Sequence, residues 1–161
     1  MHMSARKEQE EHECFWEWRN AGRRAAVLLD GEFYNSGELR SALKEQGEKL
    51  ETDGDAELAG RMYLCYGPEF VKQLNGVFAM AVLDLDKKMI FLYRDRMGVK
   101  PLFYTFWKDR LYFASRIKGL LACPGIQPEI GLEGLNEIFS VGPARTPGNG
   151  VLKGCLLYTS D

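Results

Sequence analysis

Apolar residues in the first half of the chain occur first as one unbroken run and then at regular intervals. The run AAVLL at residues 25–29 is typical of a buried strand. It stops at Asp30, Gly31 and Glu32, residue types that are depleted in strands and frequent in turns. The pattern therefore predicts a strand that ends in a tight turn, whose glycine takes a positive φ.

Two amphipathic helices are predicted after this turn. Apolar side chains recur there at intervals of three and four residues, until glycine interrupts the pattern near residues 47 and 67. Asn35 or Ser36 can cap the first helix. Asp53 or Asp55 can cap the second, because a short polar side chain accepts hydrogen bonds from the unpaired N–H groups of a first turn.

Four strands are predicted after the helices. Residues 76–95 hold two apolar runs around the polar segment 86–88, and residues 101–115 hold two more around 108–109. Each pair of runs is typical of an antiparallel hairpin. Two short helices follow at 116–123 and 132–140, and a segment rich in proline and glycine begins at residue 142. Helices followed by adjacent strands predict an α+β fold with antiparallel sheets.

Composition and charge exclude several classes of function. The chain has 161 residues, of which 45% are hydrophobic, enough for one domain with a buried core. A net charge of −2 gives no electrostatic reason to expect binding to nucleic acid or to an anionic membrane. No apolar stretch approaches the roughly 20 residues that span a bilayer, and the charged N-terminal sequence has no apolar signal core. Membrane insertion and export are therefore not expected.

Cysteine and histidine are too scattered for the common catalytic and metal sites. The four cysteines stand singly, at positions 14, 65, 123 and 155, which is typical of a reduced, cytoplasmic protein. The two histidines, His2 and His12, precede the patterned part of the chain. That part has no histidine for a Ser/His/Asp or Cys/His arrangement. No metal site is predicted, since no recognised ligand spacing is present.

Five motifs, taken in order, resemble the class II glutamine amidotransferase domain. They read LLDGEFYNSGELR, TDGDAEL, LNGVFAMAVLD, LYRDRMGVKPLFY and LYFASRIKGLL. The forms YN…ELR and RD…GVKP within them are similar to asparagine synthetases in particular. One such motif alone would be a weak signal, whereas five in the same order are specific.

The resemblance implies a fold and a division of the chain. The fold is the four-layer αββα sandwich of N-terminal nucleophile hydrolases, in which two antiparallel sheets are packed between helices. The match covers residues 25–154, a partial amidotransferase domain. Residues 1–24 match poorly, so the domain is expected to lack its first strands, and residues 155–161 are expected to be an unmatched tail or a cloning artefact. An incomplete sheet would expose an edge and lower solubility.

The resemblance also implies a glutamine site. Where the family has Asn-Gly-Glu, this chain has Asp30, Gly31 and Glu32. Asp30 and Gly31 would form the oxyanion hole, and Gly31 and Glu32 would contact bound glutamine. Asp55 would pair with the α-ammonium group of glutamine, because a carboxylate forms a charge-assisted hydrogen bond with a cation. Without the resemblance, the same residues would be interpreted as a turn and a helix cap.

Two departures from the family bear on catalysis. The family uses a cysteine at the mature N-terminus, whose free α-amine can act as the base. Here His2 follows the first methionine, and Cys14 is the only cysteine before the predicted turn, with 15 residues between it and Asp30. The nucleophile is therefore predicted to be absent.

The second departure is Asp30 itself, which replaces the family's asparagine. An ionised carboxylate has no proton to donate to an oxyanion. The loss of one such donor costs about 3–4 kcal/mol of transition-state stabilisation. This chain by itself is therefore predicted to be inactive.

The function implied by the resemblance is that of the glutaminase half of an ATP-dependent asparagine synthetase. Glutamine would be hydrolysed to glutamate and ammonia, and the ammonia would react with aspartyl-AMP in a synthetase domain. That domain, recognisable by a Ser-Gly-Gly-x-Asp phosphate loop, would bind ATP and magnesium. The loop is absent from these residues, so no cofactor is expected here. Expected partners are glutamine, the synthetase domain and a second copy in a homodimer.

Two other interpretations stay open. The chain can be the amidotransferase domain of another biosynthetic enzyme, in which case the domain joined to it would decide the acceptor. It can also be a non-catalytic remnant that binds glutamine or a partner without hydrolysis. The missing nucleophile, Asp30 and the lack of the arginine that clamps the glutamine carboxylate in the family favour this last interpretation for the chain itself.

Overall fold

A computed structural model describes residues 14–20, 23–126, 129–140, 152 and 156–157. The chain divides into two compact units, Met1–Val99 and Lys100–Asp161, which we call the N-terminal and the C-terminal unit. Each contains an antiparallel sheet and helices. Among the described residues, no helix has both the length and the apolar character to cross a membrane. The predicted α+β class with antiparallel sheets is confirmed.

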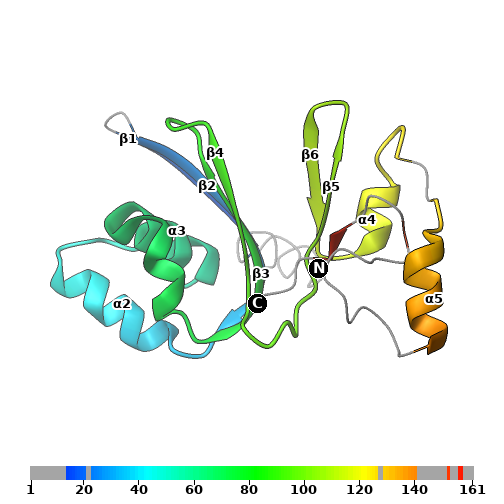
Figure 1. Ribbon diagram of the computed structural model, residues 1–161. Coiled ribbons are helices and arrows are strands. Elements are labelled where there is room, and N and C mark those ends of the chain that lie inside the picture. Colours follow the sequence, from blue (N-terminus) through cyan, green and yellow to red (C-terminus); the bar gives the residue numbers. More distant parts are fainter. Residues whose placement is uncertain (1–13, 21–22, 127–128, 141–151, 153–155, 158–161) are drawn as a thin grey trace, which may run out of the picture. The chain divides into compact units, whose positions relative to one another are not determined.

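The sheet of the N-terminal unit has the strand order β1-β2-β3-β4, and all neighbours are antiparallel (Figure 1). Its strands are β1 (Phe15–Asn20), β2 (Arg23–Phe33), β3 (Gly76–Asp84) and β4 (Met89–Arg94). The predicted hairpin at residues 76–95 is confirmed as β3 and β4, with its turn at residues 85–88.

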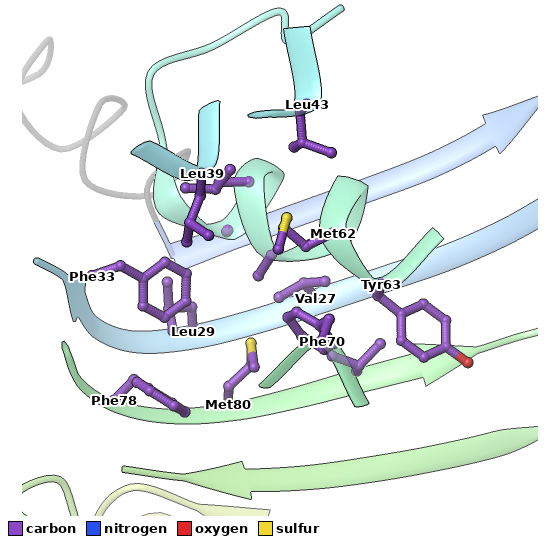
Figure 2. Close-up of a cluster of buried hydrophobic side chains, with 14 residues drawn as sticks. Val27, Leu29, Phe33, Leu39, Leu43, Met62, Tyr63, Phe70, Phe78 and Met80 are labelled. Carbon is purple, nitrogen blue, oxygen red and sulfur yellow. The ribbon is translucent and has the colours of Figure 1, made fainter. Parts of the chain in front are cut away.

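Two α-helices and a 3₁₀ helix cover one face of this sheet (Figure 1). They are α2 (Ser36–Glu45), α3 (Asp55–Tyr66) and η1 (Gly67–Gln73). Side chains of a strand alternate between its faces, and those of β2 and β3 that face the helices are large and apolar. Figure 2 shows this core, which includes Val27, Leu29, Phe33, Leu43, Met62, Phe70, Phe78 and Met80. Each such side chain contributes about 1.5–3 kcal/mol on burial, so the core fixes the helices on the strands.

Strand β2 is longer than the sequence predicts, and the expected tight turn is replaced by strand. Asp30, Gly31 and Glu32 lie within β2. Their partners on β3 are Ala79, Phe78 and Val77. The chain turns only afterwards, at residues 34–35. Pairing with a strand from a distant part of the chain overrides the local turn preference, and a short sequence window cannot reveal such pairing.

Strand β1 comes from the segment that matches the family poorly by sequence, residues 1–24. It pairs with β2 and is fixed by its tryptophans, because the guanidinium of Arg61 lies 4.0 Å from the ring centre of Trp18 and 5.7 Å from that of Trp16. A Cβ at Gly60 would come within 2.0 Å of the Trp16 ring, so a glycine of α3 makes room for β1. The sheet edge that the sequence analysis leaves uncovered is thus partly covered.

Asn35 occupies the N-cap position of α2, as one of the predicted alternatives, but its side chain does not cap the helix. Its amide nitrogen donates to the carbonyl oxygen of Gln73 at 2.9 Å, and its amide oxygen accepts from the backbone N–H of Asn75 at 3.0 Å. Asn35 therefore connects the end of β2 to the segment that leads into β3.

The C-terminal unit has a three-stranded sheet of order β6-β5-β7. Its elements are β5 (Phe103–Trp107), β6 (Arg110–Ala114), α4 (Ile117–Leu121), α5 (Leu132–Ser140) and β7 (Leu156–Leu157). The predicted hairpin at residues 101–115 is confirmed, and Lys108 and Asp109 both take a positive φ at its turn. Such a turn matches the twist of the strands it joins.

Strand β7 lies in the segment that the sequence analysis treats as an unmatched tail. Leu157 pairs with Phe103, and Leu156 pairs with Tyr104. Two apolar residues are too few to give a periodic signal, which explains why the sequence does not predict this strand. The predicted proline- and glycine-rich loop from residue 142 lies outside the described residues, apart from position 152.

Candidate functional site

The end of β2 and the start of α3 meet through one hydrogen bond. The backbone N–H of Phe33, the last residue of β2, donates to Oδ2 of Asp55, the first residue of α3, at 2.7 Å. The N-cap position of α3 is Gly54, so neither Asp53 nor Asp55 is the predicted cap. The carboxylate of Asp55 satisfies a strand N–H instead. All four predicted site residues therefore belong to one end of the N-terminal unit.

The backbone N–H of Gly31 points to the same edge of β2 as that of Phe33. The carbonyl of Phe78 accepts a hydrogen bond from the N–H of Asp95 and so points toward the β4 side of β3. Gly31 is opposite Phe78, and the backbone groups of such a non-hydrogen-bonded pair point away from each other. Residues two apart on a strand point the same way, as the bond from Phe33 to Asp55 illustrates.

This edge is not covered by a strand in the described part of the chain. Strand β1 pairs with β2 only as far as Phe15, which lies opposite Leu28. Cys14, the upstream cysteine considered as a nucleophile, directly precedes Phe15 and is exposed. The N–H of Gly31 and the carboxylate of Asp55 thus flank an accessible stretch of backbone.

Only glycine fits at position 31. Its φ is 139°, as the prediction of a positive φ requires, although it lies in a strand and not in a turn. A Cβ there would come within 2.0 Å of the carbonyl oxygen of Val77 and 2.7 Å of the Cα of Phe78. The two strands approach closely at this point, which fixes the direction of the Gly31 peptide.

Asp30 and Glu32 leave β2 on the other face of the sheet. Side chains alternate along a strand, and Leu29 and Phe33 face the helices. Asp30 is half-buried and Glu32 is exposed. The structure therefore brings Gly31 and Asp55 to one edge, while the two acidic side chains between them project from the face that α2 and α3 do not cover.

The Asp55 carboxylate keeps one oxygen available. Oδ2 is occupied by the Phe33 N–H, whereas Oδ1 lies 3.8 Å from Nη2 of Arg40, beyond hydrogen-bonding distance. Oδ1 and Arg40 thus form an ion pair that is longer than a hydrogen bond, and the Asp55 side chain is 17% exposed. A carboxylate that is oriented by one oxygen and accessible at the other can bind a cation.

Sequence reasoning missed Arg40 and Glu57, which hold the loop before Asp55. Glu57 is 1% exposed in the helix α3. A charged side chain is almost never fully buried unless it has partners, and its place one turn into an otherwise apolar helix is the signal that could have revealed it. Arg40 could have been suspected from its place in the ELR motif.

A cavity of about 300 Å³ lies at the opposite end of β2 and α3. It is lined by Arg23, Arg24, Tyr63, Cys65, Asp84 and Lys87, among others. The Tyr63 hydroxyl donates to Oδ2 of Asp84 at 2.6 Å, and the Lys87 N–H donates to Oδ1 at 2.9 Å. Burial raises the pKa of Asp84, but these hydrogen bonds and the Lys87 charge outweigh burial and lower the pKa below its ordinary value. None of these residues is a predicted site residue.

The fold defines the class of protein. A glutamine phosphoribosylpyrophosphate amidotransferase from B. subtilis, solved with ADP and GMP, aligns with a TM-score of 0.56 at 19% identity over 67% of this chain and 25% of that chain. A structure described as the allosteric regulatory enzyme of purine biosynthesis aligns with the same TM-score over 65% of this chain and 24% of that chain. The chain has the fold of the N-terminal nucleophile amidotransferases, as predicted.

The family follows from the sequence match. A family model described as the glutamine amidotransferase domain matches residues 18–156, and the chain therefore belongs to that family. The match begins within β1 and ends within β7. It thus extends into both segments that the sequence analysis places outside the domain.

Curated relatives are glutamine-hydrolysing asparagine synthetases, as the motifs predict. Asparagine synthetase 3 of Bacillus subtilis is 42% identical over 80% of this chain and 21% of that protein. Asparagine synthetase 2 of the same organism is 39% identical over 74% of this chain and 16% of that protein. A putative asparagine synthetase of Methanocaldococcus jannaschii is 32% identical over 75% of this chain and 23% of that protein. The chain spans about a fifth of the length of these relatives.

Proposed function

We propose that this chain is the glutamine-binding part of an asparagine synthetase, where the amide of glutamine is hydrolysed to supply ammonia. The family match and the names of the relatives support this proposal. The single observation that carries it is the bond from Phe33 N–H to Oδ2 of Asp55, because it orients the carboxylate beside the predicted oxyanion-hole glycine and leaves Oδ1 with only the longer, 3.8 Å ion pair to Arg40.

Each predicted site residue has a role in this proposal. Oδ1 of Asp55 accepts the α-ammonium group of glutamine, in a charge-assisted hydrogen bond. The N–H of Gly31 donates to the amide carbonyl oxygen, where negative charge develops during attack. Glu32, one residue further on, contacts the body of the ligand. Asp30 occupies the position of the family's asparagine and weakens the oxyanion hole.

The hydrolysis itself is proposed from the family resemblance. A cysteine thiol adds to the amide carbon, and the C–N bond then breaks with release of ammonia. Water hydrolyses the resulting thioester to glutamate and restores the thiol. The ammonia passes to aspartyl-AMP in a synthetase domain that uses ATP and magnesium. A homodimer and a cytoplasmic location complete the proposal, and the scattered positions of the four cysteines along the sequence support the latter.

A second candidate function is binding of glutamine without hydrolysis. The observation that favours it is Asp30, since an ionised side chain cannot donate to the oxyanion and adds a negative charge near it. In this case the chain would report the presence of glutamine or hold a partner. The two candidates share the ligand and differ in turnover.

The test is a titration of the 161-residue chain with L-glutamine, followed by NMR at the amides of Gly31 and Phe33. We expect both signals to shift with one dissociation constant, and D-glutamine, which has the same groups in the other configuration, to bind more weakly. Unchanged signals at saturating L-glutamine would contradict a glutamine site here. Measurement of released ammonia then separates hydrolysis from binding alone.

Asp30→Asn sharpens the choice between the two candidates. The variant restores an amide donor without changing the size of the side chain. If the chain hydrolyses glutamine through a nucleophile that its sequence does not reveal, ammonia release should rise by about 100-fold or more over wild type, in proportion to one recovered donor. If it only binds glutamine, affinity should improve slightly while ammonia stays at the background level.

A further inference from the structure

The loop before Asp55, residues 51–54, is held first by Glu57 of α3. The Glu57 carboxylate accepts hydrogen bonds from the N–H of Glu51 at 2.9 Å and from the N–H of Thr52 at 2.6 Å. It also accepts the Thr52 hydroxyl at 2.8 Å and Nε of Arg61 at 3.3 Å. With 1% of its surface exposed, Glu57 is occupied by these protein partners and cannot be a ligand-binding group.

The hydrogen bonds from the loop to both oxygens of Glu57 favour the ionised form of its carboxyl. Burial raises the pKa of its carboxyl, but the hydrogen bonds from Glu51 and Thr52 and the charge of Arg61 outweigh burial and lower the pKa below its ordinary value. Glu57 is therefore ionised at neutral pH and accepts from the loop at both oxygens.

Arg40 of α2 holds the carbonyl groups of the same loop. Its guanidinium donates to the carbonyl oxygens of Thr52 at 3.0 Å, Asp53 at 2.7 Å and Gly54 at 2.9 Å. A planar guanidinium satisfies several acceptors in a fixed arrangement, which the single ammonium group of lysine cannot reproduce. Arg40 thus binds three successive carbonyls that end directly before Asp55.

Together these two side chains account for the position of Asp55. The N–H groups at the start of the loop are bound by Glu57, and the carbonyls at its end are bound by Arg40. The loop has no strand or helix of its own that could fix it. Because α2 and α3 are packed on the sheet through the core, the loop transmits the position of both helices to Asp55.

We propose that Arg40 and Glu57 are positioning residues that set the affinity of this site for the α-ammonium group of an amino-acid amide. The inference rests on the proposed function, in which Asp55 binds that group. Glu57 acts through the loop, Arg40 acts through the loop and through its 3.8 Å ion pair with Oδ1 of Asp55, and the ligand touches only Asp55 among the three. A displacement of about 1 Å in a site of this kind can cost a factor of about 100, so small movements of the loop matter.

The first test needs no ligand and uses Arg40→Lys and Glu57→Gln in the 161-residue chain. Hydrogen exchange is measured at the Phe33 amide, which Asp55 protects, and at the core amide of Val82 as an internal reference. We expect exchange at Phe33 to become at least about 10-fold faster, while Val82 changes less than about threefold. A general loss of stability would instead accelerate both amides together.

The matched control is Arg24→Lys. Arg24 is an exposed arginine at the far end of β2 and pairs with Asp86, so the same chemical change is made away from the loop. We expect it to leave exchange at Phe33 unchanged. Unchanged protection of Phe33 in both Arg40→Lys and Glu57→Gln would overturn the inference, whatever the ligand of the site.

The second test compares L-glutamine with glutaramate, which is glutamine without its α-amino group. A hydrogen bond to a charged group contributes a factor of about 10–100, so wild type should prefer glutamine by that ratio. In both variants we expect this preference to fall at least about fivefold, while the dissociation constant of glutaramate changes less than about twofold. Variants that keep the full preference would overturn the inference and leave the proposed function intact. If wild type binds neither compound, the proposed function is refuted. The exchange test would still measure whether Arg40 and Glu57 position Asp55.

Discussion

Asp55 and Asp84 lie at opposite ends of the layer formed by β2 and α3. Their carboxylates differ in how many hydrogen bonds they accept. Asp84 accepts from the Tyr63 hydroxyl and from the N–H of Lys87, and Nζ of Lys87 lies 3.1 Å away. Both oxygens are used, and the residue is 7% exposed. Asp55 accepts one hydrogen bond, from the N–H of Phe33 to Oδ2, and its Oδ1 has only a 3.8 Å ion pair with Arg40.

This difference separates a structural carboxylate, Asp84, from Asp55, the one that we propose binds the ligand. Asp84 holds the hairpin turn after β3 against Tyr63 of α3, and a ligand could reach it only by displacing existing partners. Asp55 is oriented by the protein and incompletely satisfied, which is the condition for recognising a cation. The cavity beside Asp84 is the more obvious hollow, whereas the residues that we propose bind glutamine lie at the other end.

The largest expected effect is on the site end itself, with Gly31→Ala. The new Cβ would lie 2.0 Å from the carbonyl oxygen of Val77 at a φ of 139°, so the variant must separate β2 from β3. We expect the free energy of unfolding to fall by about 3 kcal/mol, measured by urea denaturation. Gly37→Ala is the control, because a Cβ there meets nothing within 4 Å and lies in α2, where alanine stabilises by up to about 1 kcal/mol. Equal effects of the two changes would show that the strands do not need glycine.

Gly31 also shows how far the sequence could predict the fold. The spacing of apolar residues correctly predicts α2, α3 and both hairpins, because each pattern lies within one short segment. The extension of β2 through Gly31 depends on β3, and β1 depends on tryptophans that pack around Arg61. Such contacts join distant parts of the chain, and a single sequence contains no local signal for them.

The residues of the proposed site could be selected from the sequence only by resemblance. The motifs single out Gly31 and Asp55, and the structure brings their elements to one edge. Residue patterns alone favour a turn and a helix cap, the interpretations that the structure replaces. The roles of Arg40 and Glu57 depend on the path of a loop that has no periodicity, so a sequence pattern could not give them.

The next largest effect is expected from exchanging the two carboxylates for amides in separate variants. Asp55→Asn should weaken glutamine binding by about 10–100-fold, the worth of a hydrogen bond to a charged group, with a smaller effect on unfolding. Asp84→Asn should lower the free energy of unfolding by about 2 kcal/mol and leave the affinity for glutamine unchanged. Calorimetric titration and urea denaturation are measured on both variants. If both variants lose the same affinity for glutamine, the Asp55 end and the Asp84 end of the unit do not differ in function.

A smaller effect on stability is expected from Tyr63→Phe, which removes one partner of Asp84 without creating a cavity. The loss of the 2.6 Å hydrogen bond leaves a buried carboxylate with fewer donors. We expect a decrease of about 1–2 kcal/mol in the free energy of unfolding, measured by urea denaturation at pH 7. Tyr66→Phe is the matched control, since its hydroxyl is bonded to the exposed Gln46 and should contribute less than about 0.5 kcal/mol. If Tyr66→Phe lowers the free energy of unfolding by as much, the effect of Tyr63→Phe does not come from its hydrogen bond to Asp84.

The smallest expected effect is the dependence of this Tyr63→Phe decrease on pH. The pKa of Asp84 is lowered in the folded protein, so its ionised form stabilises the fold above the unfolded pKa of about 4, and this contribution is lost as pH falls through the folded value. Tyr63 is one cause of the lowering, so the folded pKa in the variant lies closer to the unfolded one. The difference in unfolding free energy between wild type and Tyr63→Phe should stay constant from pH 7 to about pH 5. Below about pH 4 it should shrink, by less than about 1 kcal/mol, because protonated Asp84 no longer needs a strong donor. Urea denaturation across this range measures it, and a difference that grows as the pH falls would mean that the bond favours the protonated carboxyl.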